Sequence, residues 1–346
     1  MRKEDNSKFC HTQCNSPTVF SSLSPIKTSK VFETFWRFAY ERQEIFFNRA
    51  KGYEAPWTKD KILREYKFTN AYRASDRVSQ YLIKNVIYSG ENTPDETFFR
   101  ILIFKIFNRI DTWETLIHEI GEVRFSDYTF ENYDNILSRT MNNGNSIYSA
   151  AYIMPSANFF GHQKKHRNHL KLIELMMRDE VPFRLAEMKK MCDAFELIRS
   201  YPTLGDFLAY QFVIDINYSE ITDFDEMEFI VPGPGARDGI KKCFHSLGGL
   251  NEAEIIRIVT EKQVEMFSSL SLNFQDLWGR PLQLIDCQNL FCEVDKYSRL
   301  AHPEIKGLSG RTRIKQKYRR NYSSIEHWYP PKWKINEKIR NDLDQG

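Results

Sequence analysis

Apolar residues recur at helical spacing along most of the chain. Between residues 30 and 51, Phe32, Phe35, Trp36 and Ala39 follow the i, i+3, i+4, i+7 pattern of an amphipathic helix. Comparable patterns, most of them separated by Pro, Gly or Asn, predict helices over 68–83, 94–110, 111–120, 129–140, 145–153, 164–178, 183–199, 203–215, 251–269 and 283–298. Period-2 segments are scarce and no internal repeat is visible. The pattern predicts an all-α fold.

Changes in polarity along the chain predict how it is divided into a tail, subdomains and a C-terminal segment. Residues 1–29 are rich in Ser, Thr and Lys, which predicts a flexible polar tail. We expect one helical subdomain over 30–200 and a second over 201–300, followed by a basic C-terminal segment over 301–346.

Composition narrows the class of protein only a little. A 346-residue chain with 41% hydrophobic residues has ample material for a core, and its net charge of +3 does not by itself indicate a nucleic-acid partner. The six cysteines, at 10, 14, 192, 243, 287 and 292, form no paired C-x-x-C metal site. No run of 18 apolar residues and no signal-peptide pattern is present. We expect a soluble cytoplasmic protein without a metal or other cofactor.

A glycine-rich turn is the most distinctive local motif. The stretch EFIVPGPGARDGIKKCF, residues 228–244, places Gly233, Gly235 and Gly239 around the predicted start of a helix. Their spacing is one residue longer than the dinucleotide fingerprint, and no G-x-x-x-x-G-K-[ST] sequence occurs in the chain. The hydrophobic–Pro–Gly–x–Gly core favours a helix–hairpin–helix turn whose amides face a DNA phosphate. The alternative is an ordinary connection in which glycine supplies positive φ.

Charged residues beside the turn extend the predicted phosphate contact. We expect the DNA backbone to be bound by the three glycines together with Arg237, Lys241 and Lys242. A second basic stretch, residues 306–324, carries seven cations and no acid, and we expect DNA contacts from Arg313, Lys315 and Lys317. A solvated surface is the alternative for such a run.

The chain resembles the helix–hairpin–helix DNA glycosylase superfamily. Three blocks, residues 56–82, the turn VPGPGARDG and DCQNLFCEVDKY at 286–297, more closely resemble its α-glutamyl/putrescinyl thymine pyrophosphorylase-like family, and also the helical domain of kinases acting on 5-hydroxymethyluracil in DNA. The resemblance implies two helical subdomains with a cleft between them, and an insertion at about 245–281. It further implies that an apolar–Asp pair, here Ile285 and Asp286, serves catalysis.

The catalytic role would fall on Asp286, with Glu293 as the second choice. A carboxylate beneath the sugar stabilises positive charge as a base leaves and can activate water. The alternatives are that Asp286 caps the helix of residues 283–298 and that Glu293 pairs with a buried Arg. Arg237 stands where bifunctional relatives carry a Schiff-base lysine, and a guanidinium cannot act as that nucleophile.

The segment FTNAYRASDR offers candidates for a base-binding pocket, namely Asn70, Tyr72, Arg73, Asp76 and Arg77. Such side chains can bind the Watson–Crick edge of an extruded base. The alternative is an interhelical network that fixes the local fold.

These observations predict a monofunctional DNA glycosylase that flips a bulky modified pyrimidine out of phage DNA and excises it, in antiphage defence. Its partner would be double-stranded DNA carrying modified bases; protein partners stay open. The alternatives are a base-hypermodification enzyme acting on a modified thymine, as a pyrophosphorylase or transferase, and a non-catalytic DNA-binding module that presents such bases.

Overall fold

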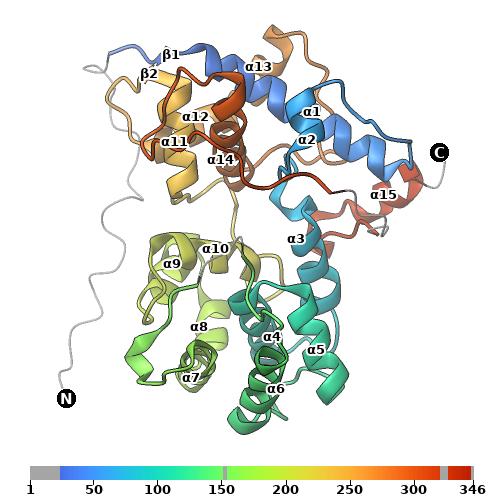
Figure 1. The fold of residues 1–346 in the computed structure, drawn as a ribbon, viewed down its shortest axis with the longest axis vertical. Coiled ribbons are helices and arrows are strands. Elements are labelled where there is room, and N and C mark those ends of the chain that lie inside the picture. The colour runs from blue at the N-terminus through green and yellow to red at the C-terminus, as the bar shows by residue number, and fades with distance from the viewer. Residues whose placement is uncertain (1–23, 151–153, 320–325, 344–346) are drawn as a thin grey trace. The chain divides into compact units, whose positions relative to one another are not determined.

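Helices dominate the part of the chain that the computed structural model describes, residues 24–150, 154–319 and 326–343 (Figure 1). The two named strands in these ranges are β1 (Lys27–Thr28) and β2 (Phe244–Ser246), which pair antiparallel. The prediction of an all-α fold is confirmed at this level. Of the predicted tail, residues 1–23 lie outside the described ranges, and Ser29 caps the first helix by accepting the Val31 N–H.

The described residues separate into two units. Unit 1 contains Val78–Glu228, and unit 2 is built from two pieces of chain, 24–77 and 229–343. This division falls at other positions than the predicted subdomain boundaries at 200 and 300, which stay predictions, as does the predicted cleft. None of the described helices is both long and apolar enough to cross a membrane.

Unit 1 is assembled around one almost completely buried helix. Its elements are α3 (Arg77–Tyr81), the π-helix η2 (Leu82–Ile87), α4 (Pro94–Phe107), α5 (Ile110–Ile120), α6 (Phe130–Asn142), η3 (Asn158–Phe160), α7 (Lys165–Arg178), α8 (Val181–Glu187), α9 (Met191–Arg199) and α10 (Asp206–Ile216). Because α4 is apolar on nearly all faces, η2, α5, α7, α8 and α10 can all pack against it. A buried ion pair, Lys105 to Asp215 at 2.5 Å, joins α4 to α10.

Unit 2 surrounds its own buried helix, α14. Its elements are α1 (Lys30–Ala50), α2 (Lys61–Glu65), η1 (Arg73–Ser75), α11 (Pro234–Cys243), α12 (Glu252–Glu261), α13 (Gln263–Ser269), α14 (Leu284–Ala301), η4 (Pro331–Trp333) and α15 (Asn336–Leu343). Helices α1, α2, α11 and α12 pack on α14, with the Phe35 and Phe291 rings 4.5 Å apart between α1 and α14. Figure 1 shows α11, α12 and α14 side by side.

Several predicted helices differ from the observed ones. Residues 68–72 are not helical, and after the short η1 the next helix begins at Arg77. The reason is local: Asp76 accepts the Asn70 N–H at 2.8 Å, and the Asn70 amide donates to the Ser75 carbonyl at 2.7 Å, so side chains take the place of helical bonds. Of the predicted 145–153 helix, residues 145–150 are irregular and 151–153 lie outside the described ranges.

The predicted helix–hairpin–helix is not confirmed. The helix before the glycine turn, α10, ends at Ile216, and residues 217–233 form turns and irregular backbone before α11 begins. Gly233 is the N-cap and Pro234 the first residue of α11, a usual way for a helix to start.

Candidate nucleic-acid interface

The glycines of the turn allow α11 to approach α14 closely. A Cβ added to Gly239 would lie 2.0 Å from the backbone oxygen of Phe291, and one on Gly235 would lie 2.3 Å from Sγ of Cys292. Neither glycine has positive φ, so the alternative explanation, that glycine is needed here to supply positive φ, does not apply to them. Close helix packing is therefore the requirement that the structure shows for both residues, and DNA binding by this turn stays a prediction.

The cations of α11 have different environments. Arg237 and Lys241, four residues apart, are exposed. Lys242 is 2% exposed, and its ammonium group lies 2.8 Å from a carboxylate oxygen of Asp295 and 3.0 Å from the Asp295 carbonyl. Burial removes Lys242 from the predicted DNA-contacting set, whereas Arg237 and Lys241 stay in it.

Asp286 lies at the third position of α14 and is only 4% exposed. One carboxylate oxygen accepts the Arg73 N–H at 2.8 Å, and the other accepts the Gln283 N–H at 3.0 Å. Both oxygens therefore hold backbone amides, one at the start of α14 and one in η1, which is distant in sequence. The structure supports the capping role, which was the alternative to catalysis.

Glu293, which is buried, and Asp76, which is half-buried, belong to a second cluster of polar contacts. Glu293 accepts the Thr69 N–H at 3.0 Å and lies 2.7 Å from the Lys296 ammonium group. Arg42 of α1 donates to the Thr69 carbonyl at 2.9 Å and to the Asn70 amide oxygen at 3.0 Å. Burial, with the neighbouring Glu293 charge, raises the pKa of Asp76 to about 7. The expected partner of Glu293 was an Arg; the observed ion pair is with Lys296.

Two of the other predicted base-pocket residues, Tyr72 and Arg73, are buried in the fold. Tyr72 is buried; its hydroxyl donates to the Arg280 carbonyl at 2.8 Å and accepts the Leu277 N–H at 3.2 Å. Arg73 is buried, and Arg77 is exposed. The segment connects α1, α14 and the chain before α14, which favours the interhelical network. Sequence reasoning missed Arg42, whose place in an amphipathic helix gave no signal of this role.

A row of exposed cations follows α14. We call residues 306–319 the basic strap. From residue 311 onward, every second residue of the strap is an exposed cation: Arg311, Arg313, Lys315, Lys317 and Arg319. Ile314 is buried between them. Lys317 lies 3.2 Å from Glu65 and over the Tyr66 ring, whereas Arg313, Lys315 and Arg319 form no ion pair within the described ranges.

The backbone of the basic strap is fixed along its length. Asp238 of α11 accepts the Ser309 N–H at 2.7 Å, and the Arg299 guanidinium donates to the Arg313 carbonyl at 3.0 Å. Further along, the Gln316 carbonyl accepts the Lys67 N–H at 3.0 Å. The exposed cations are thus carried on a positioned backbone.

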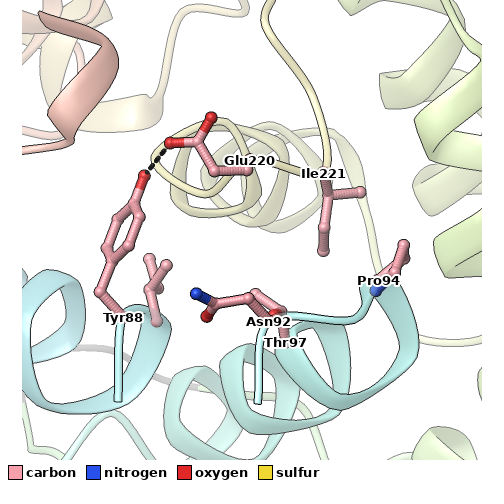
Figure 2. Close-up of a pocket in the computed structure, with 7 residues that line it drawn as sticks. Tyr88, Asn92, Pro94, Thr97, Glu220 and Ile221 are labelled. Atoms are coloured by element: carbon pink, nitrogen blue, oxygen red, sulfur yellow. Dashed lines mark hydrogen bonds between the residues drawn. The ribbon is translucent and has the colours of Figure 1, made fainter. Parts of the chain in front are cut away.

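A small pocket in unit 1 was not predicted. Its lining residues are Ile87, Tyr88, Asn92, Pro94, Thr97, Glu220 and Ile221 (Figure 2). The Tyr88 hydroxyl lies 2.7 Å from a Glu220 carboxylate oxygen and 2.9 Å from the Tyr218 carbonyl. The cavity volume is about 50 Å³, which suits a few water molecules and not a whole pyrimidine.

The histidine-rich stretch of α7 is largely structural. His166 is buried and lies 2.7 Å from an Asp134 carboxylate oxygen. His169 is buried too: Nε2 donates to the Pro155 carbonyl at 2.7 Å, and Nδ1 accepts the Tyr148 hydroxyl at 2.8 Å. Within the described ranges, no three His, Cys, Asp or Glu side chains are grouped to hold a metal ion.

Comparison with known proteins assigns the chain to a family of DNA-modifying enzymes. Residues 29–307 match the family described as 5-hmdU DNA kinase, helical domain. This protein belongs to that family. The 5-hmdU DNA kinase of Bacillus phage SP10 is 26% identical over 288 residues, which are 77% of this chain and 45% of the relative. The chain thus spans less than half of that relative's length. No solved structure matches it.

These findings correct the predicted activity. The resemblance to the helical domain of kinases acting on 5-hydroxymethyluracil in DNA is confirmed. Assignment to the glycosylase superfamily is not supported, and the predicted hydrolysis of an N-glycosidic bond is wrong, because both matches are to a DNA kinase that transfers phosphate. A DNA partner agrees with both matches.

Proposed function

We propose that this chain binds DNA carrying 5-hydroxymethylated uracil and holds it for phosphorylation of the hydroxymethyl group. The family match and the name of the phage relative supply the substrate class. In this proposal the helical chain contributes DNA binding and presentation of the modified base. None of the residues described above is proposed to bind the phosphoryl donor.

The basic strap is the observation that carries the DNA-binding part. Its exposed cations lie on a backbone anchored to α11, α14 and the segment after α2, and Glu65 is the acid that pairs with one of them. Anchoring lowers the entropy that the chain loses when it binds a polyanion. Cations presented in this way release counterions from DNA, so the affinity should fall steeply with salt concentration.

The test compares two triple variants with equal charge loss. One neutralises the strap, Arg311→Gln, Arg313→Gln and Lys315→Gln; the control neutralises exposed cations of unit 1, Arg178, Lys189 and Lys190. Fluorescence anisotropy measures binding to a labelled duplex with one 5-hydroxymethyluracil and to its thymine counterpart.

The wild-type chain should prefer the modified duplex. The strap variant should lose affinity for both duplexes. The slope of the logarithm of the association constant against the logarithm of the salt concentration should become less negative by roughly 2–3, because each phosphate contact removed accounts for about 0.9. The control should change neither quantity by a comparable amount. A wild-type chain that binds neither duplex would refute the proposed function. Equal losses in the two variants would refute the assignment to the strap.

A phosphate-transfer assay tests the second half of the proposal. The chain is incubated with labelled ATP and duplex containing 5-hydroxymethyluracil, and the nucleosides are then separated by mass. We expect binding without transfer by this chain alone. Labelled 5-phosphomethyl product would replace the presenting role with a catalytic one.

A further inference from the structure

A short loop of unit 1 is held at both ends by one buried side chain. The amide nitrogen of Asn168 donates to the carbonyls of Ser156, at 3.1 Å, and His162, at 2.8 Å, while its oxygen accepts the His162 N–H at 2.9 Å. Asn168 is 1% exposed, and the buried His169 beside it binds the Pro155 carbonyl. Residues 156–162, which we call the aromatic loop, therefore have a fixed conformation.

The tip of the aromatic loop presents a phenylalanine to solvent. Phe159 lies in η3 and is 74% exposed, the largest exposed fraction of any Phe among the exposed hydrophobic residues described. Phe160 is half-buried, and its ring lies edge-on to that of Phe159 at 5.2 Å, so it supports the outer ring. The backbone turns sharply on each side, with φ of 50° at Ala157 and 76° at Gly161. A rigidly held, exposed aromatic ring loses little entropy when it binds a flat apolar partner.

The charge around the aromatic loop indicates what that partner is. Residues 155–170 contain Lys164, Lys165 and Arg167 and no acidic residue. Arg167 is neutralised by Asp134, at 2.7 Å, and the Lys165 ammonium group lies over the Tyr148 ring at 4.3 Å. Lys164 is exposed and forms no ion pair within the described ranges; its ammonium group donates to the Ser138 hydroxyl at 3.0 Å. A flat apolar partner next to cations is best matched by a nucleobase on a phosphate backbone.

We propose that the aromatic loop is a nucleobase-stacking element, in which Phe159 stacks on an unpaired or unstacked base while Lys164 contacts the adjacent phosphate. The inference rests on the proposed DNA binding and adds a second contact, on unit 1, to the basic strap of unit 2. It differs in kind from the strap contact, because stacking is tolerant of salt and specific for exposed bases.

The test uses three variants and a fluorescent base. Phe159→Ala removes the ring, Phe159→Trp preserves stacking, and Phe183→Ala is the matched control, because Phe183 of α8 is 49% exposed in the same unit. The probe is a DNA duplex with 5-hydroxymethyluracil next to a 2-aminopurine, whose fluorescence is sensitive to stacking.

Removal of the ring should weaken binding roughly fivefold or more, since base–aromatic stacking is worth about 1–3 kcal/mol per base. It should also abolish the protein-induced change in 2-aminopurine fluorescence while the salt slope stays as in the wild type. Phe159→Trp should retain both signals, and Phe183→Ala should match the wild type.

The outcomes separate this inference from the proposed function. Normal affinity and a normal fluorescence change in Phe159→Ala would overturn the stacking role and leave DNA binding intact. Equal losses in the two alanine variants would overturn it as well. A wild-type chain that binds no DNA would overturn both.

Discussion

Replacing Asp286 by Asn should destabilise unit 2 substantially. Both carboxylate oxygens of this 4% exposed side chain accept backbone N–H groups, from Arg73 and Gln283. Hydrogen bonds to a charged group contribute about 1.5–3 kcal/mol each. An amide keeps one acceptor but turns an NH₂ group toward the other backbone N–H, which leaves a buried donor without a partner. The expected loss is about 3 kcal/mol, a large share of a typical folding free energy of about 5–15 kcal/mol.

Urea unfolding followed by tryptophan fluorescence measures this loss. Most of the indole signal comes from unit 2, which contains five of the six tryptophans, Trp36, Trp57, Trp278, Trp328 and Trp333. The control is Glu252→Gln in the first turn of α12. Within the described ranges the Glu252 side chain holds no backbone group, so the change removes a helix-dipole interaction and should cost about 0.5 kcal/mol or less. An Asp286→Asn protein within 0.5 kcal/mol of wild type would refute the structural role of this carboxylate.

Three further predictions follow from close packing and buried charge. Gly239→Ala should lower the free energy of unfolding by about 2 kcal/mol because its methyl group meets the backbone of α14, whereas Gly205→Ala, where a Cβ meets no atom within 4 Å, should cost less than about 1 kcal/mol in the same urea assay. Burial raises the pKa of Asp76 to about 7 from 3.8, so the folded state retains a proton that the unfolded chain releases. Wild-type stability should therefore fall by about 2–3 kcal/mol from pH 5 to pH 8 through this group, and Asp76→Asn should remove that part of the pH dependence. Lys242→Met should lower the free energy of unfolding by about 3 kcal/mol because it breaks a buried ion pair. Replacing the exposed Lys241 by Gln should change that free energy by less than about 0.5 kcal/mol. Equal losses of stability in the two variants would contradict the structural role of the buried pair.

The helical fold could largely be predicted because the strongest signals were periodic. The segment that became α4 is apolar on nearly all faces and starts with Pro94 and two acids, and the structure forms a helix there. Residues 68–76 also lie in a segment predicted to be helical but are not continuous helix, because Asn70 and Asp76 bind nearby backbone groups instead. Periodicity carries no information about that competition.

The roles of the candidate site residues were harder to predict. An Asp after an apolar pair fits a catalytic carboxylate and a helix cap equally well, and only the two amides that face Asp286 distinguish them. A glycine that faces another helix has the same local sequence as one that faces a phosphate. Phe159 gave no periodic signal, and its exposure depends on Asn168, nine residues away in the chain. These distinctions depend on tertiary contacts.

The two-piece construction of unit 2 has a consequence for synthesis on the ribosome. Helix α1 and the Arg73 amide emerge early, but α14 and its Asp286 emerge only after the roughly 150 residues of unit 1. Arg73 and Asp286 are 213 residues apart, so at about 5–20 residues per second the delay is roughly 11–43 s. During it, the apolar face of α1, with Phe35 and Trp36, lacks its native cover. Nascent chains stalled before residue 284 should therefore recruit chaperones, whereas unit 1, whose described residues all lie between 78 and 228, can fold by then.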